Sequence, residues 1–316
     1  MADLTLWADD GRRDRAQVIL VTGFALAVAF VALALVVNSV IYTENLATRS
    51  ASASASDAVT LRQDAGDGTA RLIASIDEHH AGETYGDLRA RLRAGVENVS
   101  AIVRRYQVVD GRAVTTSLVA VQRGAWIEQQ SAPRPFTNAS GDADWTPVND
   151  SAGAHSFRFH VVNTTVLGGK ATRHFAVVAR NGSKTWRLEI YSNASNYVGV
   201  VHHADGSDRT CTGALPTDFW VNVSAGTFAG SPCPGLGFAD GLGGVENVSF
   251  SNGDTINGTY RLLVGKADTA LDVSDFGVGG PTNARAIYGA TVHLAYESAR
   301  FRYETDVAAV PGDRDA

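Results

Sequence analysis

The longest apolar stretch of the chain runs from Ala16 to Thr43 and contains no Asp, Glu, Lys or Arg. As a helix with a rise of about 1.5 Å per residue, this stretch is about 42 Å long, whereas the hydrocarbon core of a bilayer is roughly 30 Å thick. A single helix also satisfies its own backbone hydrogen bonds in lipid. The pattern therefore predicts one transmembrane helix over residues 16–43, after a segment of residues 1–15 that is a cytoplasmic tail or a leader.

A cleavable signal peptide is the alternative interpretation of this stretch. Small residues at Ala51, Ala53 and Ala55 would suit a signal peptidase. The apolar run is, however, much longer than the core of about 7–15 residues that signal peptides use. The length therefore favours a permanent anchor.

The next segment, residues 44–110, keeps a helical pattern and is predicted to form a stalk. Chain breaks are expected at Gly66-Asp67-Gly68 and again at Ala81-Gly82, because glycine disfavours helix interiors. Thr84 and Asp87 have the spacing of a helix N-cap. The cap opens a run with apolar residues at helical spacing, which predicts one face packed on a core: Leu88, Leu92, Val96, Val99, Val103 and Tyr106.

From Gly111 onward the period of the apolar residues changes from 3.6 to 2, which indicates strands. Residues 113–122 and 156–166 alternate, and the last part of the chain, 287–307, predicts two more strands. Asn181-Gly182 between two alternating runs predicts a tight hairpin, and Asn257-Gly258 predicts a second such turn. Gly- and Pro-rich segments at 129–155 and 204–245 predict two long loops.

Together these patterns predict an α+β protein. Its parts are the tail or leader (1–15), the transmembrane helix (16–43), the helical stalk (44–110) and an antiparallel, sandwich-like, β-rich head (111–316).

The orientation of the chain follows from its asparagines. Nine of the 14 lie in Asn-x-Ser/Thr sequons, and chance would place about two there. The pattern indicates N-glycosylation outside the cell, with the N-terminus cytoplasmic, although Asn, Ser and Thr also share turns in β-rich domains. The sequons are at Asn98, Asn138, Asn149, Asn163, Asn181, Asn193, Asn222, Asn247 and Asn257.

The two cysteines, Cys211 and Cys233, both lie in the predicted extracellular head. An oxidising compartment favours a disulfide between them, which would close a loop of 22 residues and contribute about 3 kcal/mol in the chain-entropy model. Two thiols alone do not make a structural zinc site.

Charge and motifs exclude several function classes. The net charge of −6 argues against a nucleic-acid partner. No phosphate-binding loop, nucleophile elbow or HExxH motif occurs, so no catalytic, cofactor-binding or metal-binding residue is predicted and the chain is not expected to be an enzyme. His202, His203 and Asp205 are the nearest approach to a metal site, but adjacent strand residues point to opposite faces.

The order of these parts is similar to that of archaeal pilins and archaellins: a short charged leader, then RDRAQVILVTGF at the start of an apolar helix, a helical extension and a β head. That resemblance implies cleavage of the leader near Ala16 and Gln17 and packing of the helix into a filament core. The segment Asn38–Arg49, NSVIYTENLATR, also resembles a haloarchaeal family of single-pass surface proteins with no assigned function. The resemblance to this family extends along the whole chain. No Glu lies early in the apolar helix, and the head is large for a pilin subunit.

The sequence therefore predicts a single-pass surface glycoprotein that acts as a pilin-like or cell-envelope structural component. Its expected partners are the lipid bilayer and further copies of itself, through the transmembrane helix. A ligand-binding or sensory ectodomain is the main alternative, with its pocket expected near 204–245. An anchored hydrolase is a third, and nothing in the residues supplies its nucleophile or base.

Overall fold

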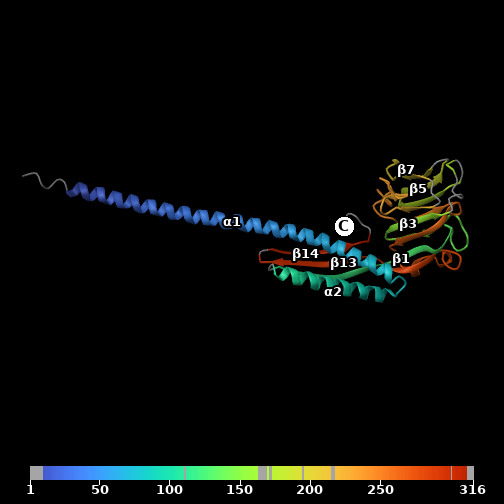
Figure 1. The fold of residues 1–316 in the computed structure, drawn as a ribbon. Coiled ribbons are helices and arrows are strands. Elements are labelled where there is room, and N and C mark those ends of the chain that lie inside the picture. Colours follow the sequence, from blue (N-terminus) through green and yellow to red (C-terminus); the bar gives the residue numbers. More distant parts are fainter. Residues whose placement is uncertain are drawn as a thin grey trace, which may run out of the picture. The chain divides into compact units, whose positions relative to one another are not determined.

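The computed structural model describes residues 10–109, 112–162, 169–170, 173–193, 196–214, 218–299 and 301–311. Within the first helix, side chains are described at 23, 24, 26–38 and from 55 onward. Contacts divide the chain into two units: residues 1–59 with 298–301, and residues 60–297 with 302–316. The first unit is helical over its described N-terminal part (Figure 1).

Two helices precede the strands. Helix α1 spans Asp10–His79 and helix α2 spans Tyr85–Val109. The expected break at Gly66–Gly68 is wrong, because α1 continues through both glycines and Gly66 lies against Val307 of the last strand. The break at Gly82 is confirmed, and its φ of 87° is one that glycine adopts without a steric penalty.

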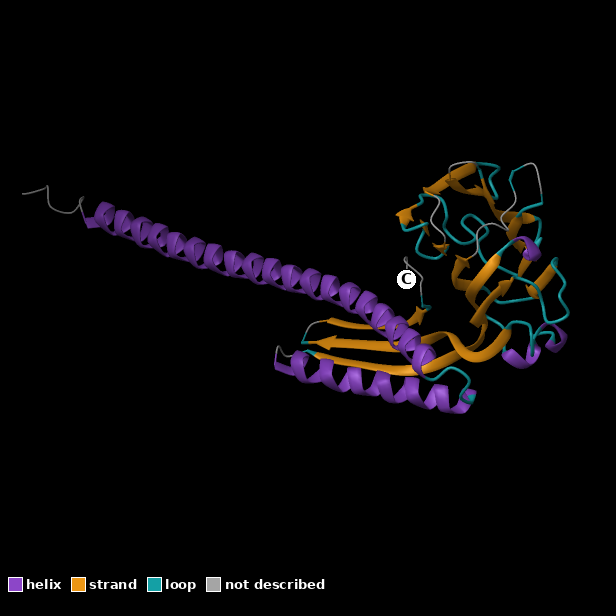
Figure 2. Cartoon of the chain, turned by 45° about the vertical axis from the view of Figure 1, so that its right-hand side comes forward, coloured by secondary structure: helices purple, strands orange, loops and turns teal. Residues whose placement is uncertain are grey.

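Helix α2 begins as its sequence predicts. The Thr84 hydroxyl oxygen accepts a hydrogen bond from the backbone N–H of Asp87, and the hydroxyl donates to the Asp87 carboxylate. The predicted apolar face is confirmed over its first half, where Leu88 and Leu92 are fully buried. It is wrong at Val99 and Tyr106, which are exposed. In the second unit, α2 lies along β1 (Figure 2).

The strands form two antiparallel sheets, of eight strands in the order β10-β9-β8-β3-β12-β1-β13-β14 and six in the order β2-β11-β4-β5-β6-β7. Their bounds are β1 Ala113–Pro135, β2 Trp145–Val148, β3 Ala154–Val162, β4 Phe175–Asn181, β5 Lys184–Ser192, β6 Asn196–His202, β7 Asp208–Ala214, β8 Asp218–Asn222, β9 Thr227–Phe228, β10 Ser231–Pro232, β11 Asn247–Ser251, β12 Asn257–Val264, β13 Thr282–Ser298 and β14 Phe301–Ala309. The α+β class with an antiparallel β-rich domain is confirmed.

One hydrophobic core lies between the two sheets. Alternate residues of β3, Phe157, Phe159 and Val161, are fully buried in it together with Trp186 and Leu188 of β5. Aromatic rings join the two layers: Tyr197 of β6 stacks on Phe219 of β8 with ring centroids 4.4 Å apart, and Phe157 stacks on Phe250 of β11. The sandwich-like arrangement therefore follows from strands with one apolar face each.

The predicted hairpin is confirmed, but its turn is Gly182-Ser183 and not Asn181-Gly182, because Asn181 still pairs with Lys184. The second predicted turn, at Asn257-Gly258, is wrong. Both residues begin β12 and pair with β1 on one side and β3 on the other. Gly258 approaches the His160 carbonyl so closely that a Cβ would not fit, so the glycine serves close strand packing rather than a turn.

The two predicted long loops are also partly wrong. The segment 129–155 contains the end of β1 and all of β2, and the segment 204–245 contains the short strands β7 to β10. Two-residue strands such as β9 and β10 have no periodicity that a sequence pattern can reveal.

Within the part of the chain whose side chains are described, no helix is both long and apolar enough to cross a bilayer.

Candidate functional site

A cavity of about 400 Å³ lies where the last turn of α1 meets the outer face of the eight-stranded sheet. This polar cavity is within the second unit of the chain. Six residues from five different segments carry its chemistry: Asp77, Trp126, Arg158, Asn222, Ser224 and Arg261.

Strand register explains why polar side chains gather here. Asn222 of β8 pairs with Arg158 of β3, Arg158 pairs with Arg261 of β12, and Arg261 pairs with Glu128 of β1. Directly paired residues point to the same face of a sheet, so these four side chains form one row across four neighbouring strands. The row lies on the outer face because Phe157 and Phe159, beside Arg158, point into the core.

Asp77 lies at the end of α1 and is only 1% exposed. Its Oδ1 accepts a hydrogen bond from the backbone N–H of Ile287 in β13, at 2.9 Å. Its Oδ2 is buried and has no hydrogen-bond partner among the described residues. Burial raises the pKa of Asp77 from 3.8 to about 7, although the Ile287 N–H and the Arg261 charge favour the ionised form.

Arg261 is held on three sides. Its guanidinium carbon lies 3.8 Å from the centroid of the Trp126 ring, its Nε lies 3.1 Å from Oε2 of Glu128, and its Nη2 donates to the backbone carbonyl of Asp77. The stacked indole and the nearby carboxylate compensate this partly buried charge in part, because the buried Nε makes no hydrogen bond of good geometry with a described residue. Burial lowers the pKa of Arg261 all the same.

Two more groups of the cavity lack partners among the described residues. The indole Nε1–H of Trp126 is buried and donates to no atom of the described residues, and Trp126 is 8% exposed. Arg158 is exposed and forms no ion pair with any described carboxylate. Oδ2 of Asp77 and Nε1 of Trp126 are thus enclosed in the protein beside the cavity, whereas the Arg158 guanidinium is open to solvent. The described residues hold no group of three or more His, Cys, Asp or Glu side chains arranged for a metal ion.

Of these six residues the sequence singled out only Asn222, as a sequon and not as part of a cavity. Two signals were present: Arg261 is a lone charge in the apolar strand TYRLLV, and Asp77 follows Ile73 by four positions and so lies on the apolar face of its helix. Their convergence depends on the strand order, which no local pattern reports.

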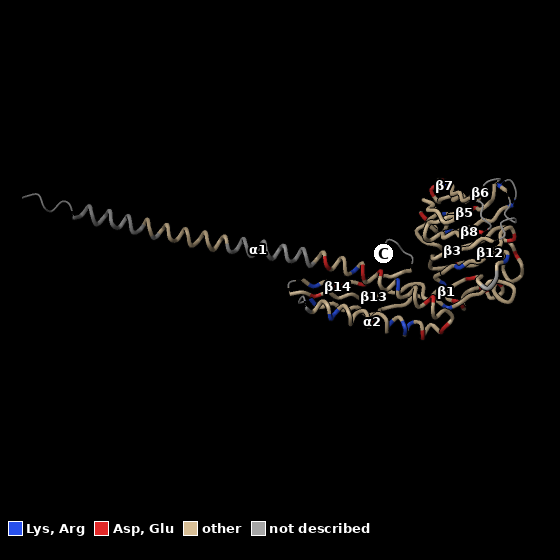
Figure 3. Tube along the Cα trace, in the orientation of Figure 1, with Lys and Arg blue, Asp and Glu red and all other residues tan. Residues whose placement is uncertain are grey.

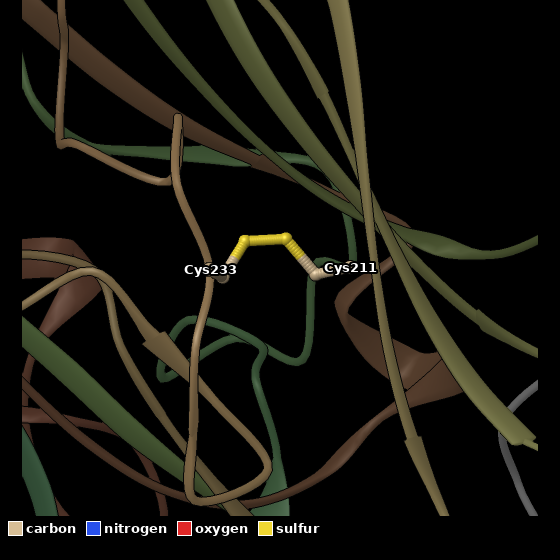
Figure 4. Close-up of a disulfide and its surroundings, with 2 residues drawn as sticks. All are labelled: Cys211 and Cys233. Atoms are coloured by element: carbon tan, nitrogen blue, oxygen red, sulfur yellow. A yellow bond between two sulfur atoms is a disulfide. The ribbon is translucent and has the colours of Figure 1, made fainter.

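The predicted disulfide is confirmed. Cys211 of β7 is bonded to Cys233, which follows β10, and the two Cα atoms are 5.8 Å apart (Figure 4). Because β7 belongs to the six-stranded sheet and β10 to the eight-stranded one, the bond links the two sheets directly.

The sequons differ in exposure. Asn98 on α2 and Asn149 in the turn after β2 are exposed. Asn138 is buried, and its amide nitrogen donates to Asp142 and Asp275 at 2.8 and 3.0 Å. Asn193 is exposed, Asn181, Asn222, Asn247 and Asn257 are half-buried at strand ends, and Asn163 lies outside the described residues. The proposed cleavage residues, Ala16 and Gln17, belong to α1, but their side chains lie outside the described part.

The histidines weighed as metal ligands do not converge. His202 pairs with Asp208 at 2.7 Å, whereas His203 lines a separate pocket with Asp205 and Arg209. That pocket and a third one, beside Cys233 and Phe238, do lie near the 204–245 segment.

No curated protein matches the chain at a significant level. Residues 12–144, which comprise nearly all of α1, all of α2 and all of β1, match the model of a family of unknown function, DUF7261.

Proposed function

We propose that the chain is a single-pass cell-surface protein whose apolar N-terminal helix lies in the membrane and whose glycosylated β-sandwich lies outside, as a pilin-like or cell-envelope structural component. In this proposal residues 16–43 form the membrane anchor. Within this stretch the structure describes the side chains at 23, 24 and 26–38. Residues 1–15 are the cytoplasmic tail or the leader.

The observation that carries the proposal is the uncovered apolar surface of α1. Every side chain described between residues 26 and 38 is exposed, and Phe24, Phe30 and Leu35 are each more than half exposed. No charged residue interrupts this part of the helix (Figure 3). A continuous apolar surface of this kind requires lipid or a neighbouring helix to cover it.

Two further features support an extracellular head. The Cys211–Cys233 disulfide fits an oxidising compartment. Exposed sequons such as Asn98 and Asn149 are accessible to a glycosyltransferase. A pilin-like subunit would bind the bilayer first and then other copies of the chain through the same apolar helix. The proposed function involves neither nucleic acid nor catalysis.

The experiment that tests the proposal is to determine the mature N-terminus by mass spectrometry, separately in membrane, filament and medium fractions of native cells. A start at Ala16 or Gln17 in the filament fraction supports the pilin-like subunit. An intact N-terminus confined to the membrane fraction supports a permanent anchor and removes the filament role. A start after Ala53 or Ala55 in the medium overturns the anchor itself.

A second candidate function, an anchored ligand-binding ectodomain, is favoured by one observation. The cavity beside Asp77, of about 400 Å³, has the exposed side chain of Arg158 in its lining, and Arg158 forms no ion pair with a described carboxylate. An intact N-terminus together with saturable binding of a small ligand would favour this function over the filament subunit.

A further inference from the structure

An apolar groove of about 220 Å³ lies between the two helices. It belongs to the second unit of the chain, because its lining begins at residue 61 of α1. It is therefore a feature of the head and separate from the apolar stretch 16–43. Most of its lining is apolar and comes from both helices: Leu61, Ala65 and Leu72 of α1, and Val96, Val99 and Val103 of α2.

The contact between Gly95 and Leu72 fixes the register of the two helices. Leu72 lies so close to Gly95 that a side chain at Gly95 would not fit. From the turn that joins the helices, α2 runs back along the end of α1 (Figure 2). Asp64 is therefore level with Val103, since the two lie equally far along their helices from this contact, and both line the groove.

The rim of the groove on α2 is apolar and exposed to solvent. Val99, Ile102 and Tyr106 are three and four positions apart, so they form one stripe along the helix, and they are 54%, 55% and 75% exposed. The face of α2 on the sheet is a different one, because the Ser100 hydroxyl accepts the backbone N–H of Thr116 in β1. Large apolar side chains that remain exposed beside an apolar groove are typical of an interaction surface.

Charges of opposite sign flank the groove on its two helices. Asp64 of α1 is exposed, and so is Arg105 of α2, which lies beside Ile102 and Tyr106 at nearly the level of Asp64. Neither charge forms an ion pair with another described residue. Lipid chains would leave both charges unpaired in hydrocarbon, whereas a surface that carries the same two charges in exchanged positions would pair both.

A second copy of the chain offers such a surface. A two-fold axis along the groove lays α1 of each copy against α2 of the other and keeps equivalent residues at the same level. Asp64 of each copy then faces Arg105 of the other. The two grooves and the two apolar stripes close on each other as the core of a four-helix bundle, in which apolar side chains of all four helices meet.

We propose that two copies of the chain dock groove to groove, and that their heads pair through a bundle of two α1 and two α2 helices with Asp64 of each copy paired to Arg105 of the other. The bundle is parallel, with both N-terminal helices leaving it in the same direction. This inference rests on the proposed function for that orientation, because two copies anchored in one bilayer must point the same way. The surface itself, residues 61–72 and 96–107, is additional to the apolar stretch 16–43.

The test is cross-linking of the full-length protein in membranes. Ile102→Cys adds one free thiol at the stripe, because the chain has only two other cysteines and they are bonded to each other. All chains also carry Asn98→Gln, since a glycan at this exposed position of α2 would border the contact. A short bismaleimide should join two copies of the Ile102→Cys protein. Glu97→Cys, at an exposed position around the helix from the stripe, should give no such dimer.

Charge reversal then tests whether the partner is a second copy in the proposed orientation. In the Ile102→Cys protein, Asp64→Arg places two guanidinium groups opposite each other, and Arg105→Asp places two carboxylates opposite each other. Each change should lower the cross-linked dimer about tenfold or more. Co-expression of the two variants with different tags should restore a mixed dimer, because every pair of facing charges is then opposite in sign.

Arg180→Asp is the matched control, since it reverses an exposed charge on β4 of the other sheet and should cross-link as the parent does. Thermal unfolding of each purified variant shows that the head remains folded. Absence of a cross-linked dimer of Ile102→Cys in membranes would overturn the proposal, and an acyl chain or another helix would then cover the groove. Equal cross-linking of the parent and both charge variants would overturn it too, as would failure of the two variants to pair with each other.

Recovery in the membrane fraction is measured separately and tests the anchor. A protein that stays in the membrane without cross-linking contradicts the pairing and leaves the anchor intact. A cross-linked dimer in the soluble fraction supports the pairing and contradicts the anchor. The two proposals therefore fail on different observations.

Discussion

Asp77 of α1 and Ile287 of β13 are joined by a hydrogen bond of 2.9 Å from the Ile287 backbone N–H to the Asp77 carboxylate, across 210 positions of sequence. The bond fixes the end of the first helix to β13, which lies between β1 and the edge strand β14 of the eight-stranded sheet. It also places a carboxyl group where water does not reach it, and the stability of the head should depend on pH as a result.

The first prediction concerns this pH dependence. The pKa of Asp77 is raised from 3.8 to about 7 in the folded protein, so the folded state holds a proton that the unfolded state releases. The contribution of the Asp77 proton to the free energy of unfolding is fully present below about pH 4. This contribution, roughly 4 kcal/mol, is lost as the pH rises through 7. Asp77→Asn cannot titrate. Denaturant unfolding between pH 4 and 8 should therefore show the parent losing stability relative to the variant.

The control for that comparison is Asp150→Asn, which removes a carboxylate from an exposed turn where φ is 47° and asparagine is well tolerated. Its stability should follow the parent across the same pH range. Parallel stability curves for the parent and Asp77→Asn would mean that Asp77 is not the titrating group.

The second prediction concerns the disulfide. Cys211→Ala should lower the free energy of unfolding by about 3 kcal/mol under oxidising conditions, because the bond between Cys211 and Cys233 no longer restricts a 22-residue loop in the unfolded chain. Denaturant titration with and without reductant measures the effect. The parent and the variant should differ little once the parent is reduced, and an equal difference in both conditions would show that packing, not the bond, is responsible.

The third prediction concerns the anchor. Val31→Arg places a charge near the middle of the apolar stretch, at a nominal insertion cost of about 2.5–3.5 kcal/mol, and should reduce recovery of the protein in the membrane fraction. Val273→Arg makes the same substitution at an exposed position of the head. The second variant should fractionate like the parent. Unchanged membrane recovery of Val31→Arg would contradict the anchor.

The fourth prediction separates the sequons. Glycopeptide mass spectrometry of the native protein should find sugar on Asn98 and Asn149, which are exposed, and none on Asn138. The Asn138 amide is buried and donates to two carboxylates, so an attached glycan would break both hydrogen bonds and open the loop. Sugar on Asn138 in the folded protein would show that this loop opens, and nine bare sequons would remove the main argument for the orientation.

Sequence patterns predicted the elements whose cause is local. The Thr84–Asp87 cap begins a helix because the Thr84 side chain bonds within one turn. The β4–β5 hairpin forms at the predicted place, with its turn one residue later at Gly182-Ser183, because the turn and both strands are adjacent in sequence. The cysteine pair followed because the chain has only two. Where the same local rules failed, long-range packing was stronger: α1 continues through Gly66 against Val307, and Gly258 pairs within a sheet instead of turning.

The polar cavity was decided by the tertiary structure alone. The strand order β8-β3-β12-β1 brings Asn222, Arg158, Arg261 and Glu128 into one row across the sheet. Asp77, at the end of α1, lies beside this row. Hydrophobic periodicity is a property of a few neighbouring residues and determines which face of a strand is buried. Strand order is decided by how all the apolar faces cover one another at once, so the sequence alone predicted the sheets' inner faces but not which outer side chains would lie together.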